Sequence, residues 1–286
     1  MTNGPNNNFD RFSPLEMDYI IFSPFEDNCP IKLNILNTEI LLNQSPVLKI
    51  IIELLCRIGE EGIKLTLKGN LPIKVIKDIY NQNLLPDRAI DLRIIKIHTE
   101  TDWILLHNVR LVLTMAGLIR KKKNMLLLTK KCKKLQKDKN YSNFFYDFMK
   151  SFTLQFCWAY NDRFENQDIG QIAFLYSLYL INKYGDEFRD MNYYSNLYLK
   201  AFPSMLEYAD TSQESYSMRS SSYQTRFIER FAIWFGFVEE EIIEGTHYFD
   251  RRIRIKRTKL LQELLQVNSK TLCSIYKIDE HSGYIN

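Results

Sequence analysis

The order of the helix and strand signals between residues 45 and 137 constrains the fold of this chain more than any other feature. Ser45 and Pro46 supply a helix N-cap and a proline at the first helical position, and apolar residues then recur at helical spacing until Gly59. In chain order, the following residues predict a strand at 63–66, a helix at 73–80, a helix at 102–116, strands at 118–119 and 125–128 around a basic turn, and a last helix after Thr129.

This order is that of a winged helix, in which three helices pack together, a small sheet closes one side and a hairpin, the wing, projects from one end. The stretches 116–119 (AGLI) and 128–131 (LTKK) resemble the pattern of bacterial winged-helix domains. Gly117 suits a left-handed turn that ends the third helix, and Thr129 suits the cap of the next helix. The resemblance implies a winged-helix-like domain over residues 41–140.

The same ending recurs near the C-terminus. A helix at 226–235 leads into Gly236, a strand is predicted at 253–255, and Thr258 precedes an amphipathic helix at 259–265. The stretch from Gly236 to Thr258 is longer than the stretch from Gly117 to Thr129, so the second hairpin is the longer of the two. We therefore expect a second, degenerate winged-helix-like unit.

The two arms of this second hairpin carry opposite charges. The first arm is acidic, with Glu239, Glu240, Glu241 and Glu244, and the second is basic, with Arg251, Arg252, Arg254, Lys256 and Arg257. Opposite charges on facing strands contribute ~0.2–1 kcal/mol per pair. These side chains are therefore expected to neutralise one another and to leave little charge for a ligand.

The remaining segments complete a mainly α fold. Residues 1–40 are expected to form an N-terminal arm, frayed over 1–13, and residues 19–42 to contain short strands because Pro24 and Pro30 interrupt the apolar runs. Residues 141–286 are expected to form a helical domain, with helices at 143–160, 169–184 and 191–208 and an exposed loop at 210–222. Of the 38 aromatic residues, 29 lie between Tyr141 and Phe249, and most of them are expected in the core of this half.

A second resemblance rests on residues 64–72 (KLTLKGNLP), which follow the helix opened by Ser45 and Pro46. This pattern is similar to an uncharacterised bacterial region associated with plasmid-type ORF-3-like and other mobile-element proteins. The similarity covers residues 36–136 and 226–266. It implies a bacterial origin and a mobile-element setting, and it implies no catalytic residue.

The net charge of +4 is unevenly distributed. Residues 120–139 contain ten Lys/Arg and one acid, a balance of +9, which leaves −5 for the other residues. The candidate nucleic-acid-binding residues are those of the basic turn and the following helix: Arg120, Lys121, Lys122, Lys123, Lys130, Lys131, Lys133 and Lys134. Such side chains bind the phosphate backbone without reading sequence. A solvated basic face and a site for an acidic protein partner remain alternatives.

The third predicted helix argues against sequence-specific recognition. A recognition helix needs several exposed polar side chains that reach base edges. Between Trp103 and Ala116 the polar residues are His107, Asn108, Arg110 and Thr114. We interpret this helix as mostly buried and His107 as a hydrogen-bonded, partly buried histidine.

Composition narrows the class of protein further. Five widely spaced cysteines without a CxxC, and four histidines without ligand spacing to them, favour a reduced intracellular compartment and no metal site. Signatures of common metal, nucleophile and phosphate-loop chemistry do not occur in the sequence, so we expect neither an enzyme nor a cofactor. The sequence has no signal-like N-terminus and no apolar run of ~20 residues, so we expect a cytoplasmic protein without a membrane partner.

The sequence therefore predicts a non-enzymatic nucleic-acid-binding protein of winged-helix type, with low sequence specificity and a basic wing as its contact surface. The alternative is a protein-interaction or scaffold protein. In that case both winged-helix units are structural, and an apolar face forms a homodimer or binds a partner.

Overall fold

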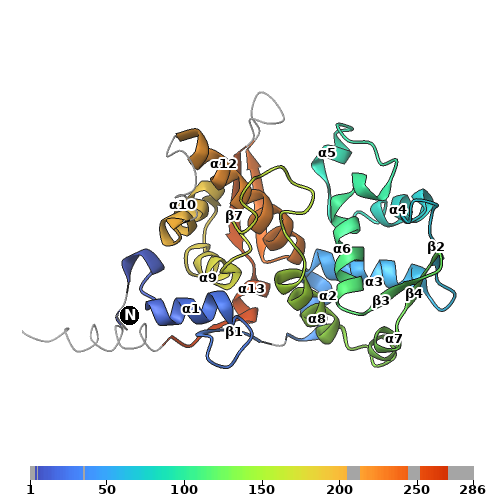
Figure 1. Cartoon of the computed structure of the whole chain (residues 1–286), viewed down its shortest axis with the longest axis horizontal. Helices are drawn as coiled ribbons and strands as arrows, with labels where there is room; N and C mark the ends of the chain where they lie inside the picture. The colour runs from blue at the N-terminus through green and yellow to red at the C-terminus, as the bar shows by residue number, and fades with distance from the viewer. Residues whose placement is uncertain (1–3, 5, 35, 205–212, 244–251, 270–286) are drawn as a thin grey trace, which may run out of the picture. The chain divides into compact units, whose positions relative to one another are not determined.

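The computed structural model describes residues 4, 6–34, 36–204, 213–243 and 252–269. The chain forms two compact units. We name them by the sign of their net formal charge. The basic unit comprises Ile35–Asn161 and Trp234–Gly236. The acidic unit comprises Met1–Asn34, Asp162–Ile233 and Phe237–Asn286. Helices dominate both units, and the described strands form three small antiparallel sheets, so the mainly α class is confirmed (Figure 1).

The basic unit follows the expected order of elements. Its first helix, α2 (Thr38–Gln44), leads directly into α3 (Pro46–Ile58), where the Ser45 side chain accepts a hydrogen bond from the Leu48 N–H. The elements that follow are β2 (Ile63–Lys64), α4 (Ile73–Tyr80), α5 (Arg88–Asp91), the 3-10 turn η2 (Glu100–Asp102), α6 (Ile104–Met115), β3 (Ile119–Lys122), β4 (Met125–Leu128), α7 (Lys130–Lys137) and α8 (Tyr141–Leu154). Expected and observed bounds agree for α3, α4 and β4.

A small sheet closes the core of the basic unit. Its strand order is β2-β4-β3, with Ile63 opposite Leu126 and Ile119 opposite Leu128. All four side chains are buried, and so is the apolar face of α3. Each such burial stabilises the fold by ~1.5–3 kcal/mol. The sheet is therefore held by its inner face, and its outer face carries Lys64, Arg120 and Lys122 beside the half-buried Met125 and Leu127.

An aromatic cluster explains why residues 234–236 belong to the basic unit. The Phe235 ring lies 5.6 Å from Phe145, 5.8 Å from Phe148 and 5.4 Å from Phe152, measured between centroids. These three residues lie on one face of α8 at i, i+3 and i+7 spacing. The predicted core role of the aromatic residues is confirmed here.

The acidic unit is built from three separate parts of the sequence, Met1–Asn34, Asp162–Ile233 and Phe237–Asn286. Its elements are the 3-10 turn η1 (Asn7–Phe9), α1 (Pro14–Phe22), β1 (Ile31–Leu33), α9 (Phe174–Tyr184), β5 (Arg189–Asp190), α10 (Met191–Ala201), α12 (Gln213–Tyr223), the π-helix η3 (Gln224–Ile233), β6 (Val238–Ile243), β7 (Arg252–Arg257), α13 (Lys259–Leu264) and β8 (Leu265–Val267). Strand β1 pairs antiparallel with β8. The core contains fully buried Tyr176, Tyr198, Tyr223, Phe227 and Phe231.

The acidic unit repeats seven elements of the basic unit in the same order, whereas the sequence indicated a repeat of the ending alone. Helix α9, β5, α10, the α12–η3 helix, β6, β7 and α13 correspond to α3, β2, α4, α6, β3, β4 and α7, and the sheet order β5-β7-β6 matches β2-β4-β3. The register matches as well: the pairs Ile63–Leu126 and Ile119–Leu128 correspond to Arg189–Ile255 and Val238–Arg257. Strands β4 and β7 therefore correspond residue by residue, without a gap.

The backbone at the predicted glycine and threonine positions is the same in both copies. Gly117 and Gly236 have φ values of 68° and 82°. The Thr129 N–H donates to the Leu118 carbonyl, and the Thr258 N–H donates to the Phe237 carbonyl, at 3.1 and 3.0 Å. Each threonine side chain also caps the helix that follows it. The sequence pattern that ends both units therefore corresponds to the same backbone geometry at the glycine and at the threonine.

Residues 14–44 correct the prediction of an arm with short strands. Residues 14–22 form α1, and residues 38–44 form α2, so 31–33 is the only strand among the described residues of that range. A reciprocal capping box starts α1: the Ser13 side chain accepts from the Glu16 N–H, and the Glu16 carboxylate accepts from the Ser13 N–H. Nor is the segment before it frayed where it is described, because Phe12 is fully buried, with its ring 4.9 Å from Tyr179.

The predicted loop at 210–222 is also wrong where it is described. Residues 213–223 form helix α12, in which Ser220 and Ser222 are buried. Serine has a low intrinsic helix propensity, which tertiary packing overrides here. The rest of that loop, together with Glu244 and Arg251 of the second hairpin, lies outside the described residues.

Within the described ranges, no helix has both the length and the apolar character that crossing a membrane would need.

Candidate nucleic-acid interface

The β3–β4 hairpin carries four of the predicted residues. The strands pair from Ile119–Leu128 to Lys122–Met125, which leaves Lys123 and Asn124 as a two-residue turn. Lys123 has a left-handed φ of 54°, as the first position of a type II′ hairpin turn requires. Arg120, Lys121, Lys122 and Lys123 are all exposed. The hairpin therefore presents four consecutive cations to solvent.

Two further lysines lie near this hairpin, and sequence reasoning missed both. Lys64 on β2 pairs with Met125, which pairs in turn with Lys122, so the three residues form one row across the sheet. Lys68 lies in the turn after β2, next to Gly69, and a Cβ built on that glycine would lie 3.1 Å from the Lys121 ammonium nitrogen. Both lysines are exposed. The long-range pairing of β2 with β4 brings them beside the β3–β4 hairpin.

Helix α7 supplies the other four predicted residues. Thr129 caps it by accepting from the Cys132 N–H at 3.2 Å, and Cys132 is buried beneath it. Lys131 pairs with Asp147 at 2.8 Å, and Lys133 pairs with Glu60. In the described part of the chain, no ion pair involves the remaining six: Arg120, Lys121, Lys122, Lys123, Lys130 and Lys134.

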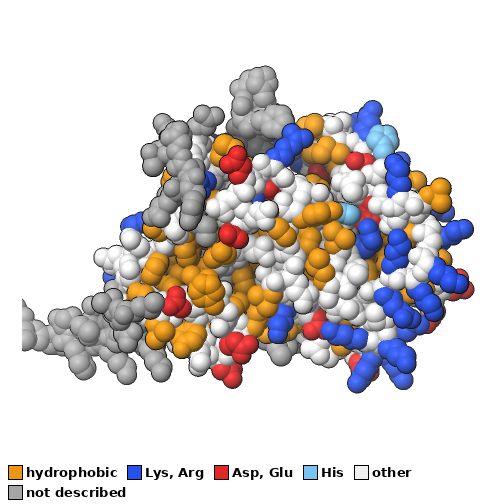
Figure 2. Space-filling model, in the orientation of Figure 1, with side chains coloured by type: hydrophobic (Ala, Val, Ile, Leu, Met, Phe, Trp, Pro, Cys, Tyr) orange, Lys and Arg blue, Asp and Glu red, His pale blue; other side chains and the backbone are white. Residues whose placement is uncertain are grey.

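The charge of the whole unit reinforces this local feature. The basic unit holds 21 Lys/Arg and 11 Asp/Glu, a formal charge of +10, so the acidic unit carries −6. Figure 2 shows lysine and arginine side chains gathered over the part of the basic unit that carries β3, β4 and α7. Charge of one sign on one unit attracts polyanions over a distance of about one Debye length, ~8–10 Å in physiological salt.

Helix α6, which corresponds to the third helix of the expected order, is largely buried. Seven of its twelve residues are buried, including His107 and Asn108. Thr114 and Met115 are its exposed positions, and both lie at its C-terminal end. This burial leaves α6 without the row of exposed polar side chains that base reading requires.

A buried polar cluster holds α6 in place. Glu100 is fully buried, and its carboxylate contacts His107 Nδ1 at 2.9 Å, Arg110 Nε at 2.5 Å and the Leu71 N–H at 2.6 Å. His107 Nε2 lies 3.3 Å from the Tyr160 hydroxyl. Burial raises the pKa of Glu100, but the hydrogen bond with His107, the charge of Arg110 and the Leu71 N–H together bring that pKa below its ordinary value. His107 is thus a hydrogen-bonded structural histidine.

The described part of the second hairpin places opposite charges on facing strands, and one of these facing pairs forms an ion pair. Glu239 lies opposite Lys256, and Glu241 lies opposite Arg254, with a 2.9 Å ion pair. Arg252 pairs with Asp190 on β5, also at 2.9 Å. The same fold element therefore carries compensated charge in the acidic unit and uncompensated charge in the basic unit.

Comparison with known proteins bears on the basic unit alone. Residues 43–141 match the family model of the Y4jL N-terminal domain. The match covers 99 of the 286 residues and contains α3 through α7, including the complete basic segment. No curated protein and no solved structure matches the chain.

Two further features of the described residues concern metal-ligand side chains and thiols. No group of three His, Cys, Asp or Glu side chains that could hold a metal ion occurs among them. The four cysteines within those ranges, Cys29, Cys56, Cys132 and Cys157, are free thiols.

Proposed function

We propose that the protein binds nucleic acid through the basic wing, contacting the phosphate backbone without reading base sequence. The observation that carries the proposal is the contrast between the two hairpins: they share one register, yet acids neutralise the second and leave the first uncompensated. The contact surface consists of Arg120, Lys121, Lys122, Lys123, Lys130 and Lys134, extended by Lys64 and Lys68. Lys131 and Lys133 contribute less, because Asp147 and Glu60 already pair with them.

Low specificity follows from the helix that would otherwise read bases. Sequence readout needs donors and acceptors that reach into the major groove, and α6 buries most of its side chains. Phosphate contacts alone give binding that depends steeply on salt and weakly on sequence. We therefore expect similar affinities for unrelated duplexes of equal length.

The test is retardation of a short DNA duplex by the full-length protein at ~50 mM salt, where phosphate contacts are strong. Wild-type protein should retard the duplex, and the variant K121E/K122E/K123E should not. A matched control is R163E/K200E/K259E, which changes the net charge by the same amount at exposed positions of the acidic unit.

Loss of binding in the wing variant, with binding kept in the control, supports the wing as the contact surface. Equal loss in both variants would show that net charge alone matters. No retardation by wild-type protein ends the proposal, and light scattering that then shows a stable dimer would favour the protein-interaction alternative.

A further inference from the structure

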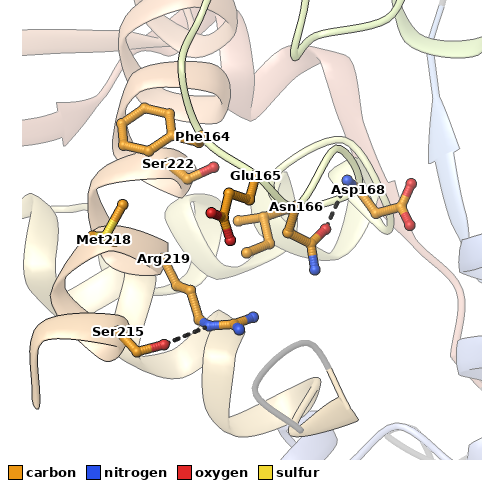
Figure 3. Close-up of a pocket in the computed structure, with 9 residues that line it drawn as sticks. Phe164, Glu165, Asn166, Asp168, Ser215, Met218, Arg219 and Ser222 are labelled. Carbon is orange, nitrogen blue, oxygen red and sulfur yellow. Dashed lines mark hydrogen bonds between the residues drawn. The ribbon is translucent and has the colours of Figure 1, made fainter. Parts of the chain in front are cut away.

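The acidic unit contains a pocket far in sequence from the basic segment. It is a cavity of about 370 Å³ between loop 164–169 and helix α12 (Figure 3). Cavities of ~300–1,000 Å³ are the usual size of small-molecule sites, so this one suits a small ligand. From the loop it is lined by Phe164, Glu165, Asn166, Asp168 and Ile169, and from α12 by Ser215, Met218, Arg219 and Ser222.

A buried arginine fixes the loop wall of this pocket. Arg226, on the π-helix η3, is fully buried and donates Nε and Nη2 to the Asp162 carboxylate at 2.6 and 2.9 Å. It also donates to the backbone carbonyls of Phe164, Asn166 and Ile169. Because one guanidinium binds three carbonyls of the loop, the loop is held in a single shape before any ligand arrives.

The helix wall presents polar groups that lack partners. Ser215, Met218, Arg219 and Ser222 are spaced i, i+3, i+4 and i+7 along α12 and therefore share one face. Ser222 is 1% exposed, and its Oγ has no hydrogen-bond partner among the described residues. The buried Arg219 Nη1 also lacks one there, although Arg219 Nε donates to Ser215 at 3.4 Å. Unpaired buried polar groups cost stability, so two of them beside one cavity point to a ligand.

The π-helix is a second, independent sign of a site. Ten residues of π-helix follow α12 without a break, and they carry Arg226. π-Helical turns are rare and are frequently found at functional sites. Here the π-helix aims Arg226 at the loop while α12 lines the pocket.

The charges of the lining define the ligand. Glu165 faces the α12 side chains in Figure 3, so the pocket is lined by a carboxylate on one wall and by the guanidinium of Arg219 on the other. A simple anion would meet the carboxylate of Glu165, and a simple cation would meet the guanidinium of Arg219. Phe164, Ile169 and Met218 supply apolar surface. We propose that this pocket binds a free α-amino acid with an apolar side chain, its carboxylate on Arg219 and Ser222 and its ammonium group on Glu165.

The experiment is titration calorimetry of the full chain with leucine, methionine and phenylalanine, alongside N-acetylleucine and leucinamide. At least one free amino acid should bind, and the two blocked compounds should bind about tenfold more weakly or less, since each loses a charge-assisted contact. Arg219→Gln and Glu165→Gln should each weaken binding by a similar factor. Ser222→Leu should place a bulky apolar side chain at the carboxylate position and abolish binding, whereas Ser221→Leu, at the exposed neighbouring position, should bind like wild type.

Three outcomes would overturn the proposal. These are no binding of any of the three amino acids to wild-type protein, equal binding of the blocked compounds, or unchanged affinity in Arg219→Gln. The last result decides the matter even if Ser222→Leu does not fold. None of these outcomes depends on nucleic-acid binding by the basic unit.

Discussion

Glu241 and Arg254 face each other across the β6–β7 hairpin, and a carboxylate oxygen lies 2.9 Å from a guanidinium nitrogen. By the correspondence of β7 with β4, Arg254 matches Met125, and Met125 pairs with Lys122. An ion pair in one hairpin therefore stands where the other has a lone cation. The two hairpins have the same register but different charge. A single acidic substitution in the β3–β4 hairpin should therefore make its charge more like that of the β6–β7 hairpin.

Met125→Glu makes this conversion. The new carboxylate would lie in one row between Lys64 and Lys122 and would offset one of their two positive charges. We expect nucleic-acid affinity to fall, and the slope of log K against log salt to become shallower by about one, as for the loss of one phosphate contact. Fluorescence anisotropy with a labelled duplex measures both quantities.

The control for this prediction is Met125→Gln, which keeps the shape and polarity of the new side chain without its charge. It should bind with nearly wild-type affinity and salt dependence. If the glutamine and glutamate variants bind equally, the charge of the row has no part in binding.

Lys123→Gly separates stability from binding. Lys123 has a φ of 54°, a conformation that costs a residue with a side chain ~1–2 kcal/mol and costs glycine almost nothing. The variant should therefore be about 0.5–1 kcal/mol more stable to urea unfolding while it loses one phosphate contact. A decrease in stability would show that the lysine side chain supports the turn.

Glu100→Gln tests the buried cluster beneath α6. Removing this charge leaves His107 and Arg110 facing a neutral group, and we expect roughly 2–3 kcal/mol lower stability at pH 7. Because the folded-state pKa of Glu100 lies below its ordinary value of 4.5, its contribution is fully present above that value and is lost as the pH falls further. Urea unfolding from pH 7 to pH 3 should show a smaller acid-dependent loss in the variant. Parallel curves for the two proteins would contradict this role.

Arg226→Lys keeps the charge beside Asp162 and removes most of the hydrogen bonds to loop 162–169. We expect about 2 kcal/mol lower stability, because several buried carbonyls lose their donor. Chemical denaturation measures the loss, and the exposed Arg163→Lys is the matched control. A variant as stable as wild type would show that the loop does not need the guanidinium.

Local signals in the sequence were sufficient for α3, α4 and β4, whose expected and observed bounds agree, but not for α2. Ser45, Gly117 and Thr129 set the bounds of helices through their own backbone preferences, so these bounds follow from residues close in the chain. Helix α12 could not be predicted in the same way, since its serines acquire their place only through the packing of Ser220 and Ser222. The missed capping box at Ser13 and Glu16 was a local signal, masked by the prolines that follow it.

In the candidate site as well, some residues follow from local sequence and others only from tertiary structure. Arg120 to Lys123 and Lys130 to Lys134 form a charge run that is visible in the sequence, whereas Lys64 joins them only through the pairing of β2 with β4, two strands far apart in the chain. The ion pairs of Lys131 with Asp147 and of Lys133 with Glu60 also depend on tertiary structure. Sequence alone therefore located the basic surface without its extent or its internal neutralisation.

The most direct test of phosphate binding by the wing is the salt dependence of DNA affinity for wild-type protein and for K121Q/K122Q/K123Q. Anisotropy titrations between ~50 and ~200 mM salt give the slope of log K against log salt. The account predicts a steep slope for wild-type protein and a slope shallower by about three for the variant, one for each lost contact. Equal slopes for the two proteins, or a flat slope for wild-type protein, would contradict it.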